Sequence, residues 1–272
     1  MKPLLDRVAV VTGAGSGIGR ALSIELAHRG CDLAVVDIDT QAAESCADEV
    51  RKVGRRASAH RVDVSSRAEM SRLPEQVIRE HGHVHLLVNN AGVTVGKSFE
   101  EHTLEDFDWV VGVNFWGTVH GCRFFLPYLQ LEHEAHIVNL SSIFGIFGAP
   151  AQTSYCATKF GIRGFSEALR AELSGTGVGV SVVHPGAIRT NIIRGNPFSD
   201  VEQQEKLARR YDRAAMSPER AAQIIVHGIE KGHLRILVGS DARVLDVAKR
   251  LFPAWSQTLL VPLVQKVLGL QR

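Results

Sequence analysis

The stretch VAVVTGAGSGIGRA, residues 8–21, runs from an apolar segment directly into a glycine-rich turn and then into a helical pattern. Glycines at positions 13, 15, 17 and 19 permit a tight turn and let backbone amides come close to a bound group. The start of the following helix adds partial positive charge, which suits a pyrophosphate. The spacing departs from the common GxGxxG fingerprint, because Ile18 and Arg20 stand where its last glycine would fall, and it fits TGxxxGxG instead. We therefore predict a dinucleotide-binding turn after the first strand.

Short β-branched runs alternate with longer helical patterns through most of the chain. We expect strands at residues 8–12, 32–38, 57–64, 84–90, 136–141, 179–185 and 234–239. We expect helices at residues 17–29, 40–53, 66–82, 103–131, 153–174 and 217–231. Several of the strands are almost continuously apolar, as parallel strands buried on both faces are. The sequence therefore predicts an α/β fold with a doubly wound parallel sheet of the Rossmann type.

Two segments fall outside this alternation. Residues 190–218 form a long excursion between the sixth and seventh strands, and we expect them to act as a helical lid. Residues 241–272 follow the last strand and are too apolar to be solvated. We expect residues 1–240 to form one dinucleotide-binding catalytic domain, with the C-terminal extension packed on it or on a partner subunit. Basic residues share this extension, which leaves peripheral attachment to a membrane as an alternative.

The overall composition is that of an ordinary globular protein. The chain of 272 residues is 45% hydrophobic and 22% charged, with a formal net charge of +2, and no block of like charges supports nucleic-acid binding. The N-terminus has no secretory pattern, and the run LLVPLV at 259–264 is far shorter than the roughly 20 residues that span a bilayer. Four cysteines without CxxC spacing indicate free thiols. We therefore expect a cytoplasmic protein.

Asp37 ends the second expected strand, 18 residues after Gly19. A carboxylate at this position can accept hydrogen bonds from the ribose of an adenosine and would repel a 2′-phosphate. Ser16 and Ile38, its expected neighbours, bring no positive charge to offset that repulsion. We therefore expect NAD as the cofactor, with NADP as the alternative. Asp37 also fits a simpler role, as an acceptor that caps the turn after the strand.

Seven short motifs follow one another in a fixed order: TGAGSGIG at 12–19, DV at 63–64, NNAG at 89–92, Asn114, NLSS at 139–142, YCATK at 155–159 and PGAIRT at 185–190. In this order they closely resemble the motifs of the short-chain dehydrogenase/reductases, in their compact single-domain subgroup. The resemblance spans residues 8 to about 240. It implies a catalytic group of Asn114, Ser142, Tyr155 and Lys159. It implies cofactor contacts from Gly13, Ser16, Gly17, Ile18, Gly19, Asp37, Asp63, Val64, Asn90, Ala91, Gly92, Tyr155, Lys159, Pro185, Gly186, Ile188 and Thr190.

The resemblance also implies how these residues divide the work. Asp63 and Val64 would hold the adenine ring, and residues 185–190 would contact the nicotinamide end. Ser142 would hold the substrate oxygen, because it lies thirteen residues before Tyr155 as the family pattern requires and Ser141 does not. Lys159 would also fix the ribose hydroxyls.

Tyr155 and Lys159 stand four positions apart at the start of an expected helix, so they share one face. An unperturbed tyrosine has a pKa near ~10, and a neighbouring ammonium group favours the phenolate. The positive nicotinamide ring of an oxidised cofactor acts in the same direction, so we expect the pKa of Tyr155 to fall toward the operating pH. Tyr155 would then take the proton of an alcohol, or return it to a ketone. Taken alone, the two residues also fit an ordinary surface pair.

Asn114 lies inside the helical stretch DFDWVVGVNFWGTVHGCRFF, where asparagine is a poor helix former. Glycines recur nearby at positions 112, 117 and 121. A local distortion that aims the Asn114 side chain inward would account for this pattern. The family uses the residue to position a water molecule in a proton relay.

Two histidine-rich stretches, HGHVH at 81–85 and HEAH at 133–136, resemble metal sites only superficially. The first straddles the end of a helix and the start of a strand, and no acidic or sulfur ligand stands at zinc-site spacing from it. We expect both stretches to be structural and predict no metal. Cys156, beside Tyr155, is expected to be a packing residue.

An apolar segment between Ser142 and Tyr155 indicates the kind of substrate. Ile143, Phe144, Ile146 and Phe147, together with Val93 and Val95, predict an apolar pocket under the lid, suited to a hydrophobic secondary alcohol or ketone; they also fit plain core positions. The family resemblance implies a homodimer or homotetramer built on helices 103–131 and 153–174. Two other readings remain open, a nucleotide-sensing protein without catalysis and a membrane-surface scaffold.

Overall fold

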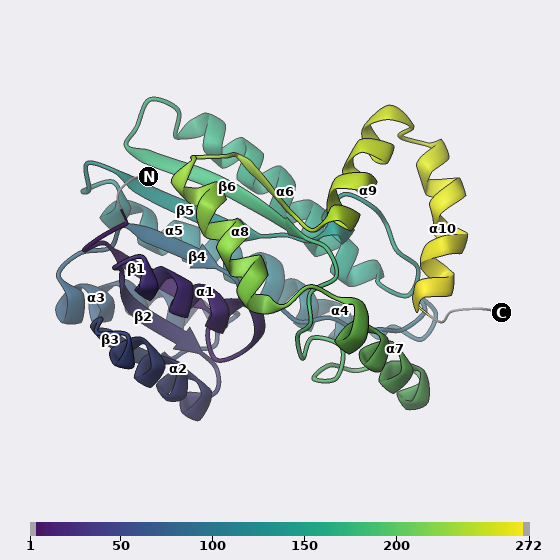
Figure 1. Ribbon diagram of the computed structural model, residues 1–272, viewed down its shortest axis with the longest axis horizontal. Coiled ribbons are helices and arrows are strands. Elements are labelled where there is room, and N and C mark those ends of the chain that lie inside the picture. Colours follow the sequence, from purple (N-terminus) through teal and green to yellow (C-terminus); the bar gives the residue numbers. More distant parts are fainter. Residues whose placement is uncertain (1–3, 269–272) are drawn as a thin grey trace.

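The computed structural model describes residues 4–268, and its centre is one parallel sheet. The seven strands lie in the order β3-β2-β1-β4-β5-β6-β7, and every neighbouring pair is parallel. Figure 1 shows the sheet between two layers of helices. The predicted doubly wound α/β fold is therefore confirmed. The strands are β1 (Val8–Thr12), β2 (Asp32–Asp37), β3 (Ala57–Arg61), β4 (Leu86–Asn89), β5 (Ala135–Leu140), β6 (Val178–Pro185) and β7 (Arg235–Val238).

Each face of the sheet is covered by its own set of helices, because the strands are apolar on both sides. One face packs against α1 (Gly17–His28), α2 (Thr40–Lys52) and α8 (Pro218–Glu230), which contribute Leu22, Ala47 and Ile225 to the first core cluster. The other face packs against α3 (Arg67–His81), α5 (Gly117–Leu129) and α6 (Thr153–Glu172), with Leu73, Phe125 and Phe165 in the second cluster. The expected helices 17–29, 40–53, 66–82, 153–174 and 217–231 are thus confirmed within a residue or two.

The long helix expected at 103–131 is interrupted in its middle. It consists of α4 (Leu104–Val110), a π-helical segment η1 (Val111–Trp116) and α5. A π-helical turn inserts an extra residue and redirects the side chains that follow it. The distortion predicted around Asn114 is therefore confirmed, and Asn114 is completely buried within it.

The strand order reverses between β1 and β4, because the chain builds outward from β1 in one direction and then returns to start β4 on its other side. In open parallel sheets, such a reversal leaves a crevice outside the carboxyl ends of the strands. The sequence motifs from the glycine-rich turn, β4, β5 and β6 all follow the carboxyl ends of their strands. The topology alone therefore brings them to one edge of the sheet.

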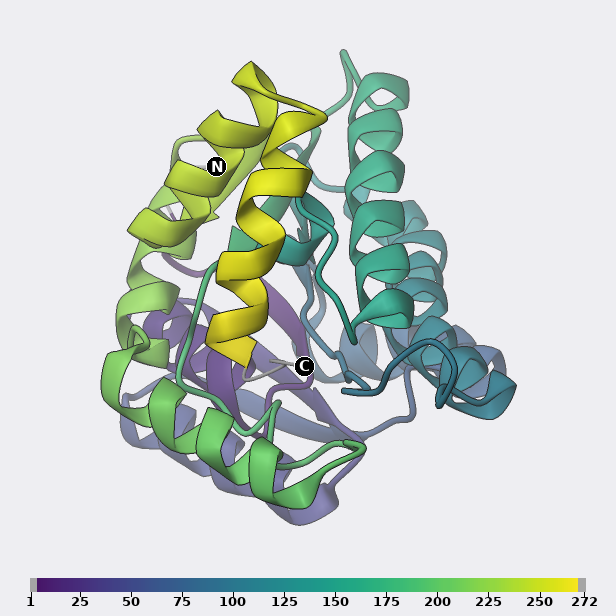
Figure 2. The ribbon, with the colours of Figure 1, turned by 90° about the vertical axis from the view of Figure 1, so that its right-hand side faces the viewer.

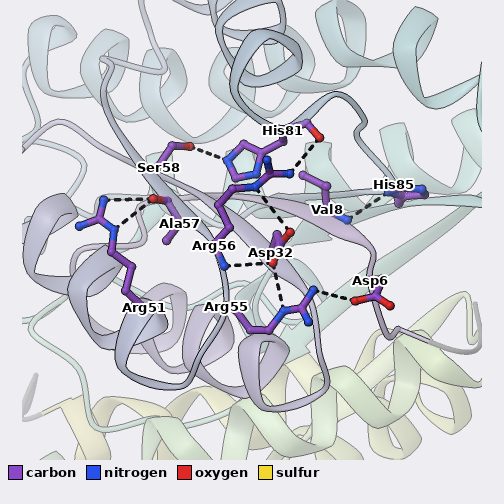
Figure 3. Close-up of polar contacts among 10 residues, drawn as sticks. All are labelled: Asp6, Val8, Asp32, Arg51, Arg55, Arg56, Ala57, Ser58, His81 and His85. Atoms are coloured by element: carbon purple, nitrogen blue, oxygen red, sulfur yellow. Dashed lines mark hydrogen bonds and ion pairs between the residues drawn. The ribbon is translucent and has the colours of Figure 1, made fainter.

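The opposite edge of the sheet is closed by a polar network (Figure 3). Asp32, at the start of β2, accepts hydrogen bonds from the Arg55 side chain at 3.0 Å and from the Arg56 backbone at 3.1 Å. The backbone N–H of Val8, at the start of β1, donates to Nδ1 of His85 at 3.1 Å. These contacts satisfy polar groups where the strands begin. They therefore stabilise the amino-terminal ends of these strands, which lie away from the motifs.

Two helical segments lie outside the core layers, as Figures 1 and 2 show. The excursion at 190–218 carries α7 (Val201–Ala214). The C-terminal extension forms α9 (Ser240–Leu251) and α10 (Trp255–Leu268), which stand as a hairpin beyond β7. Residues 1–3 of the expected domain and 269–272 of the expected extension lie outside the described residues. Over 4–268, no helix has the length and apolar character needed to cross a bilayer.

Candidate active site

A cleft of about 550 Å³ opens at the carboxyl edge of the sheet and contains most of the residues singled out from the sequence. Of the four expected catalytic residues, Ser142, Tyr155 and Lys159 line it, and Asn114 does not. Of the expected cofactor contacts, Gly19 alone does not line it, and the remainder do: Gly13, Ser16, Gly17, Ile18, Asp37, Asp63, Val64, Asn90, Ala91, Gly92, Tyr155, Lys159, Pro185, Gly186, Ile188 and Thr190.

The glycine-rich turn is shaped for a close approach of another group. Gly13 and Gly17 have φ values of +63° and +52°, a region that favours glycine. A β-carbon at Gly19 would collide with the carbonyl oxygen of Gly13 and with the side chain of Asn90, so Gly19 supports the turn from behind. The Asn90 side chain donates to the carbonyl oxygens of Thr12 and Gly13 at 2.9 and 3.0 Å. The NNAG motif therefore fixes the turn.

The first turn of α1 keeps its backbone donors available. Its N-cap residue, Ser16, makes no capping hydrogen bond with its side chain, and the first turn has no acidic residue. By contrast, Asp39 caps α2 and Ser217 caps α8 through their side chains. Uncapped amides at a helix N-terminus, beside a turn with glycine at its tight positions, suit a pyrophosphate. The turn therefore fits the phosphates of a dinucleotide.

Asp37 combines the two roles considered for it. Its Oδ1 accepts a hydrogen bond from the backbone of Asp39 at 3.0 Å, which caps the turn after β2. Its Oδ2 accepts from the backbone of Gly15 at 2.8 Å, which ties it to the glycine-rich turn. A carboxylate oxygen can accept more than one hydrogen bond, so both remain able to receive a ribose hydroxyl. The carboxylate also lines the cleft.

The loop after β6 is held by the beginning of the C-terminal extension. The backbone N–H of Ala187 donates to Oδ2 of Asp241 at 2.7 Å, and that of Gly186 donates to the carbonyl oxygen of Val238 at 2.8 Å. A β-carbon at Gly186 would collide with the Asp241 carboxylate. Asp241 therefore positions the loop expected at the nicotinamide end, a contact that the sequence reasoning missed.

Both adjacent serines line the cleft, but their hydroxyl groups have different partners. Ser141 is buried, and its hydroxyl donates to the Lys159 carbonyl oxygen at 2.8 Å, which fastens β5 to α6. Ser142 accepts from the backbone of Phe144 at 3.1 Å, which leaves its own proton available for another acceptor. The carbonyl oxygen of Ser142 accepts from Nδ1 of His184 at 3.0 Å. Burial lowers the pKa of His184 to about 4, so this positioning residue, also missed from the sequence, is neutral.

Tyr155 and Lys159 lie side by side, but the expected direction of the tyrosine shift is wrong. Burial raises the pKa of the Tyr155 phenol above its usual value, although the nearby Ser142 hydroxyl lowers it in part. Lys159 is only 4% exposed, and burial lowers its pKa to about 8. The Lys159 ammonium group donates to the Leu140 carbonyl oxygen at 2.8 Å and lies 5.5 Å from the centre of the Tyr155 ring. For the pKa of Tyr155, desolvation therefore outweighs the hydrogen bond with Ser142, the one contact that lowers it.

Asn114 connects two walls of the site from behind. Its Oδ1 accepts from the backbone of Val93 at 2.8 Å, and its Nδ2 donates to the Val93 carbonyl oxygen at 2.9 Å and to the Thr158 hydroxyl at 3.2 Å. These bonds use both amide protons and one of the two acceptor positions of Oδ1, and they join the loop after β4 to α6, the helix that carries Tyr155 and Lys159. The structure thus gives Asn114 a positioning role.

The apolar residues that line the part of the cleft expected to hold the substrate differ in part from those predicted. Val93, Ile143 and Phe144 line it. The expectation for Ile146, Phe147 and Val95 is wrong, because these side chains are buried in the protein instead. The short 3-10 turn Ile143–Gly145 directs the first two residues into the cleft and the next two into the core. Lining residues missed from the sequence are Thr94, Trp109, Val113, Gln152, Ile192, Ile193, Asn196, Leu207 and Tyr211.

The segment at 190–218, expected to act as a lid, is bonded to the loop that follows β4. The backbone N–H of Gly96 donates to the Pro197 carbonyl oxygen at 2.9 Å, and that of Ser199 donates to the Gly96 carbonyl oxygen at 3.1 Å. The ring of Phe198 fills the space where a β-carbon of Gly96 would stand. Inside the lid, Leu207 joins a small apolar cluster that includes Cys156. Cys156 therefore packs against the lid, as expected of a packing residue.

One cluster outside the cleft brings an acidic residue to the histidine-rich stretch. Glu132 lies 2.9 Å from Nδ1 of His83 and 3.3 Å from Nε2 of His85, a contact that spacing in the sequence did not indicate. Since the N–H of Val8 donates to Nδ1 of His85, the proton of neutral His85 resides on Nε2 and points to Glu132. A protonated nitrogen has no lone pair for a metal. These contacts therefore fit a hydrogen-bonded cluster better than a metal site.

Comparison with known proteins identifies the family. The family described as short chain dehydrogenase matches residues 7–197. The putative oxidoreductase SadH of Mycobacterium tuberculosis is 39% identical over 270 residues, which cover 98% of each chain. The crystal structure of a short chain dehydrogenase/reductase from Burkholderia phymatum in complex with NAD has a TM-score of 0.86 and 30% identity, covering 94% of this chain and 97% of that one.

A second solved structure, a short chain dehydrogenase from Mycobacterium paratuberculosis bound to NAD, has a TM-score of 0.79 and 25% identity, covering 88% of this chain and 98% of that one. The family match covers well over half of the chain. It agrees with the order of the sequence motifs, with the strand order of the sheet and with the residues that line the cleft. The chain belongs to the short-chain dehydrogenase/reductase family and is an oxidoreductase of that family.

Proposed function

We propose that the protein interconverts a secondary alcohol and a ketone with NAD, with Tyr155 as the general acid and base. The observation that carries this proposal is the meeting of Ser142, Tyr155 and Lys159 in the cleft that also contains the uncapped glycine-rich turn. A proton donor, an oxygen-binding hydroxyl and a dinucleotide cradle in one cleft are the parts that hydride transfer to a carbonyl carbon requires. Cofactor and substrate would therefore meet at the carboxyl ends of β4, β5 and β6.

The chain's own residues account for the movement of the proton. Because burial raises the pKa of Tyr155, the neutral phenol is the resident form, and it can donate its proton to the oxygen of a ketone. Ser142 would donate a hydrogen bond to the same oxygen and stabilise the charge that develops on it. When bound, the cofactor would accept the hydride in its oxidised form and supply it in its reduced form, and the positive charge of the oxidised ring would favour the phenolate needed to take a proton from an alcohol.

Asp37 supports NAD rather than NADP as the cofactor. Its carboxylate lines the cleft beside the glycine-rich turn, where it could accept from a ribose hydroxyl and would repel a 2′-phosphate. The neighbouring Ser16 and Ile38, which also line the cleft, bring no positive charge. An NADP-preferring carbonyl reductase remains the alternative within this chemistry.

An apolar alcohol or ketone fits the substrate end of the cleft, since Ile143, Phe144, Ile192, Ile193 and Leu207 form its walls. The direct experiment is a screen of secondary alcohols and ketones that follows the absorbance of the reduced cofactor, with NAD and NADP in parallel. We expect turnover of at least one apolar substrate, faster with NAD. Tight NAD binding without turnover of any candidate would favour the non-catalytic, nucleotide-sensing protein instead.

Self-association is the second part of the proposal. Trp116 and Phe160, on the helical stretches expected to form a subunit interface, are 50% and 40% exposed. Large apolar side chains this exposed on neighbouring helices favour contact with a second copy. We propose a homodimer or homotetramer built on α5 and α6. Sedimentation velocity of Trp116→Ala and Phe160→Ala against the unaltered protein tests it, and an unchanged sedimentation coefficient in both variants would contradict it.

The third part of the proposal concerns the hairpin formed by α9 and α10. Gln257 of α10 donates to the Gly148 carbonyl oxygen at 2.7 Å, which supports packing of the extension on its own domain. Phe252 and Trp255, at the bend between the helices, remain 56% and 73% exposed. We propose that this bend packs on a partner subunit, with a membrane surface as the alternative. Truncation after residue 251 removes the bend and α10 but keeps Asp241 and Asp246, and it distinguishes the two, because it would reduce the oligomer in the first case and abolish co-sedimentation with liposomes in the second.

The cysteines agree with a cytoplasmic location, which we include in the proposal. Cys31, Cys46, Cys122 and Cys156 are all buried and unpaired, and burial raises the pKa of each thiol. Buried thiols with a raised pKa are inert packing groups, compatible with a reducing compartment.

A further inference from the structure

Tyr211 reaches the substrate end of the cleft from the lid. It lies on α7 and packs with Leu207 and Ala208 in the apolar cluster that the lid forms with Ala149 and Cys156. Its ring is half-buried, and the residue lines the same cleft as Tyr155. Tyr211 also contributes to the raised pKa of Tyr155, so the two phenols lie within electrostatic reach of each other. The lid therefore brings a second phenol to the reacting end of the site.

The hydroxyl of Tyr211 has no hydrogen-bond partner among the residues that the structure describes. Three other polar side chains that line the cleft, those of Thr94, Gln152 and Asn196, are bonded within the protein. Thr94 donates to Oε1 of Gln152 at 2.6 Å, and Asn196 accepts from the backbone of Thr94 at 3.3 Å and donates to the Ile192 carbonyl oxygen at 2.7 Å. The residue is only partly buried, and its hydroxyl is not one of the buried polar atoms that lack a partner, so the hydroxyl stays accessible from the cleft. Its partner is therefore to be sought in the cleft.

The surroundings of this hydroxyl favour a neutral hydrogen bond. Burial, and to a lesser extent the charge of Asp241, raise the pKa of Tyr211, so the phenol stays protonated and can donate. The walls around it come mainly from Ile192, Ile193 and Leu207. A single donor in an apolar wall discriminates strongly between ligands with and without an acceptor at that point, because the unmatched ligand leaves the donor unsatisfied.

We propose that Tyr211 is a specificity-determining residue whose hydroxyl binds a second oxygen of the substrate, so that the protein acts on apolar ketones and alcohols that carry another carbonyl or hydroxyl group. This proposal rests on the proposed function, since it assumes that the reacting oxygen lies at Tyr155 and Ser142. The second oxygen would bind to Tyr211, on the segment expected to act as a lid. The substrate would then contribute to holding the lid against the domain.

The test compares ligands that differ by one carbonyl group: octan-2-one on one side, and octane-2,3-dione, octane-2,4-dione, octane-2,5-dione and octane-2,6-dione on the other. Dissociation constants are measured by calorimetry on protein saturated with NAD, and reduction rates are measured with reduced cofactor. The variant Tyr211→Phe keeps the ring in the lid cluster and removes only the hydroxyl. Tyr128→Phe is the matched control, because Tyr128 is a partly buried tyrosine that packs against the second core cluster and does not line the cleft.

We expect the unaltered protein and Tyr128→Phe to bind at least one dione about five- to tenfold more tightly than octan-2-one, and Tyr211→Phe to lose this preference. The proposal is overturned if no dione is preferred, if the preference survives in Tyr211→Phe, or if that variant weakens octan-2-one equally. Dione preference in binding without any reduction would contradict the proposed function and leave the role of Tyr211 standing. Reduction of these ketones without tighter binding of any dione would overturn the role of Tyr211 and leave the proposed function standing.

Discussion

The Nζ atom of Lys159 lies 5.5 Å from the centre of the Tyr155 ring, one helical turn along α6. Lys159 is buried and Tyr155 is partly buried, and desolvation raises the pKa of the phenol and lowers that of the ammonium group to about 8, so it favours the neutral form of each. Desolvation therefore disfavours the charged form of both side chains. A charged ligand in the cleft would shift the pKa values of both side chains.

The first prediction concerns stability and pH. Folding lowers the pKa of Lys159 from 10.5 to about 8, so between these values the unfolded chain binds more protons and the folded protein gains stability as pH rises. Below pH 8 the full penalty of the buried ammonium applies. Lys159→Met removes it, so the variant's advantage in free energy of unfolding should shrink by up to about 3 kcal/mol between pH 8 and 10.5. Urea denaturation across this range measures it, and a constant difference would contradict it.

The second prediction concerns the choice of cofactor. Asp37→Ala should weaken NAD binding about tenfold, because ribose hydroxyls lose a charged acceptor, and should improve the binding of NADP. The matched control is Asp39→Ala, since Asp39 caps α2 and does not line the cleft. Calorimetric titration of both nucleotides provides the comparison. Tighter binding of NADP than of NAD to the unaltered protein would refute the cofactor assignment.

The third prediction contrasts two glycines inside helices. Gly19→Ala places a methyl group against the Gly13 carbonyl oxygen and the Asn90 side chain, so we expect a lower melting temperature and loss of NAD binding. Gly164→Ala, in α6, meets no atom within 4 Å and should stabilise the protein by about 0.5–1 kcal/mol. Thermal unfolding measures both changes. Equal effects of the two substitutions would mean that the turn is not packed as described.

Local patterns in the sequence predict much of this protein. Strands such as 8–12 are recognisable because their burial on both faces requires continuous apolar residues, and the turn at 12–19 because its tight φ angles require glycine. Asn114 and its neighbouring glycines were enough to predict a distorted helix, which the structure contains as a π-helical segment. In each case the cause lies within a few residues of its effect.

Contacts between distant parts of the chain were not predictable in this way. His184 positions Ser142 from 42 residues away, and Asp241 holds Ala187 from 54 residues away. Tyr211 could have been suspected from the apolar spacing of Leu207, Ala208 and Tyr211 on one helical face, but nothing local indicates that this face covers the cleft. The direction of the Tyr155 pKa was wrong for the same reason, because desolvation depends on everything packed around the phenol.

The measurement that tests the central claim most directly is the turnover of Tyr155→Phe with a substrate from the alcohol and ketone screen, alongside its affinity for NAD. Loss of the phenolic hydroxyl should lower kcat by about 10²–10⁴-fold while the dissociation constant of NAD stays nearly unchanged. Tyr128→Phe, which removes a hydroxyl outside the cleft, should keep full activity. If Tyr155→Phe retained the turnover of the unaltered protein, the proton would have to come from another group and the assignment would be wrong.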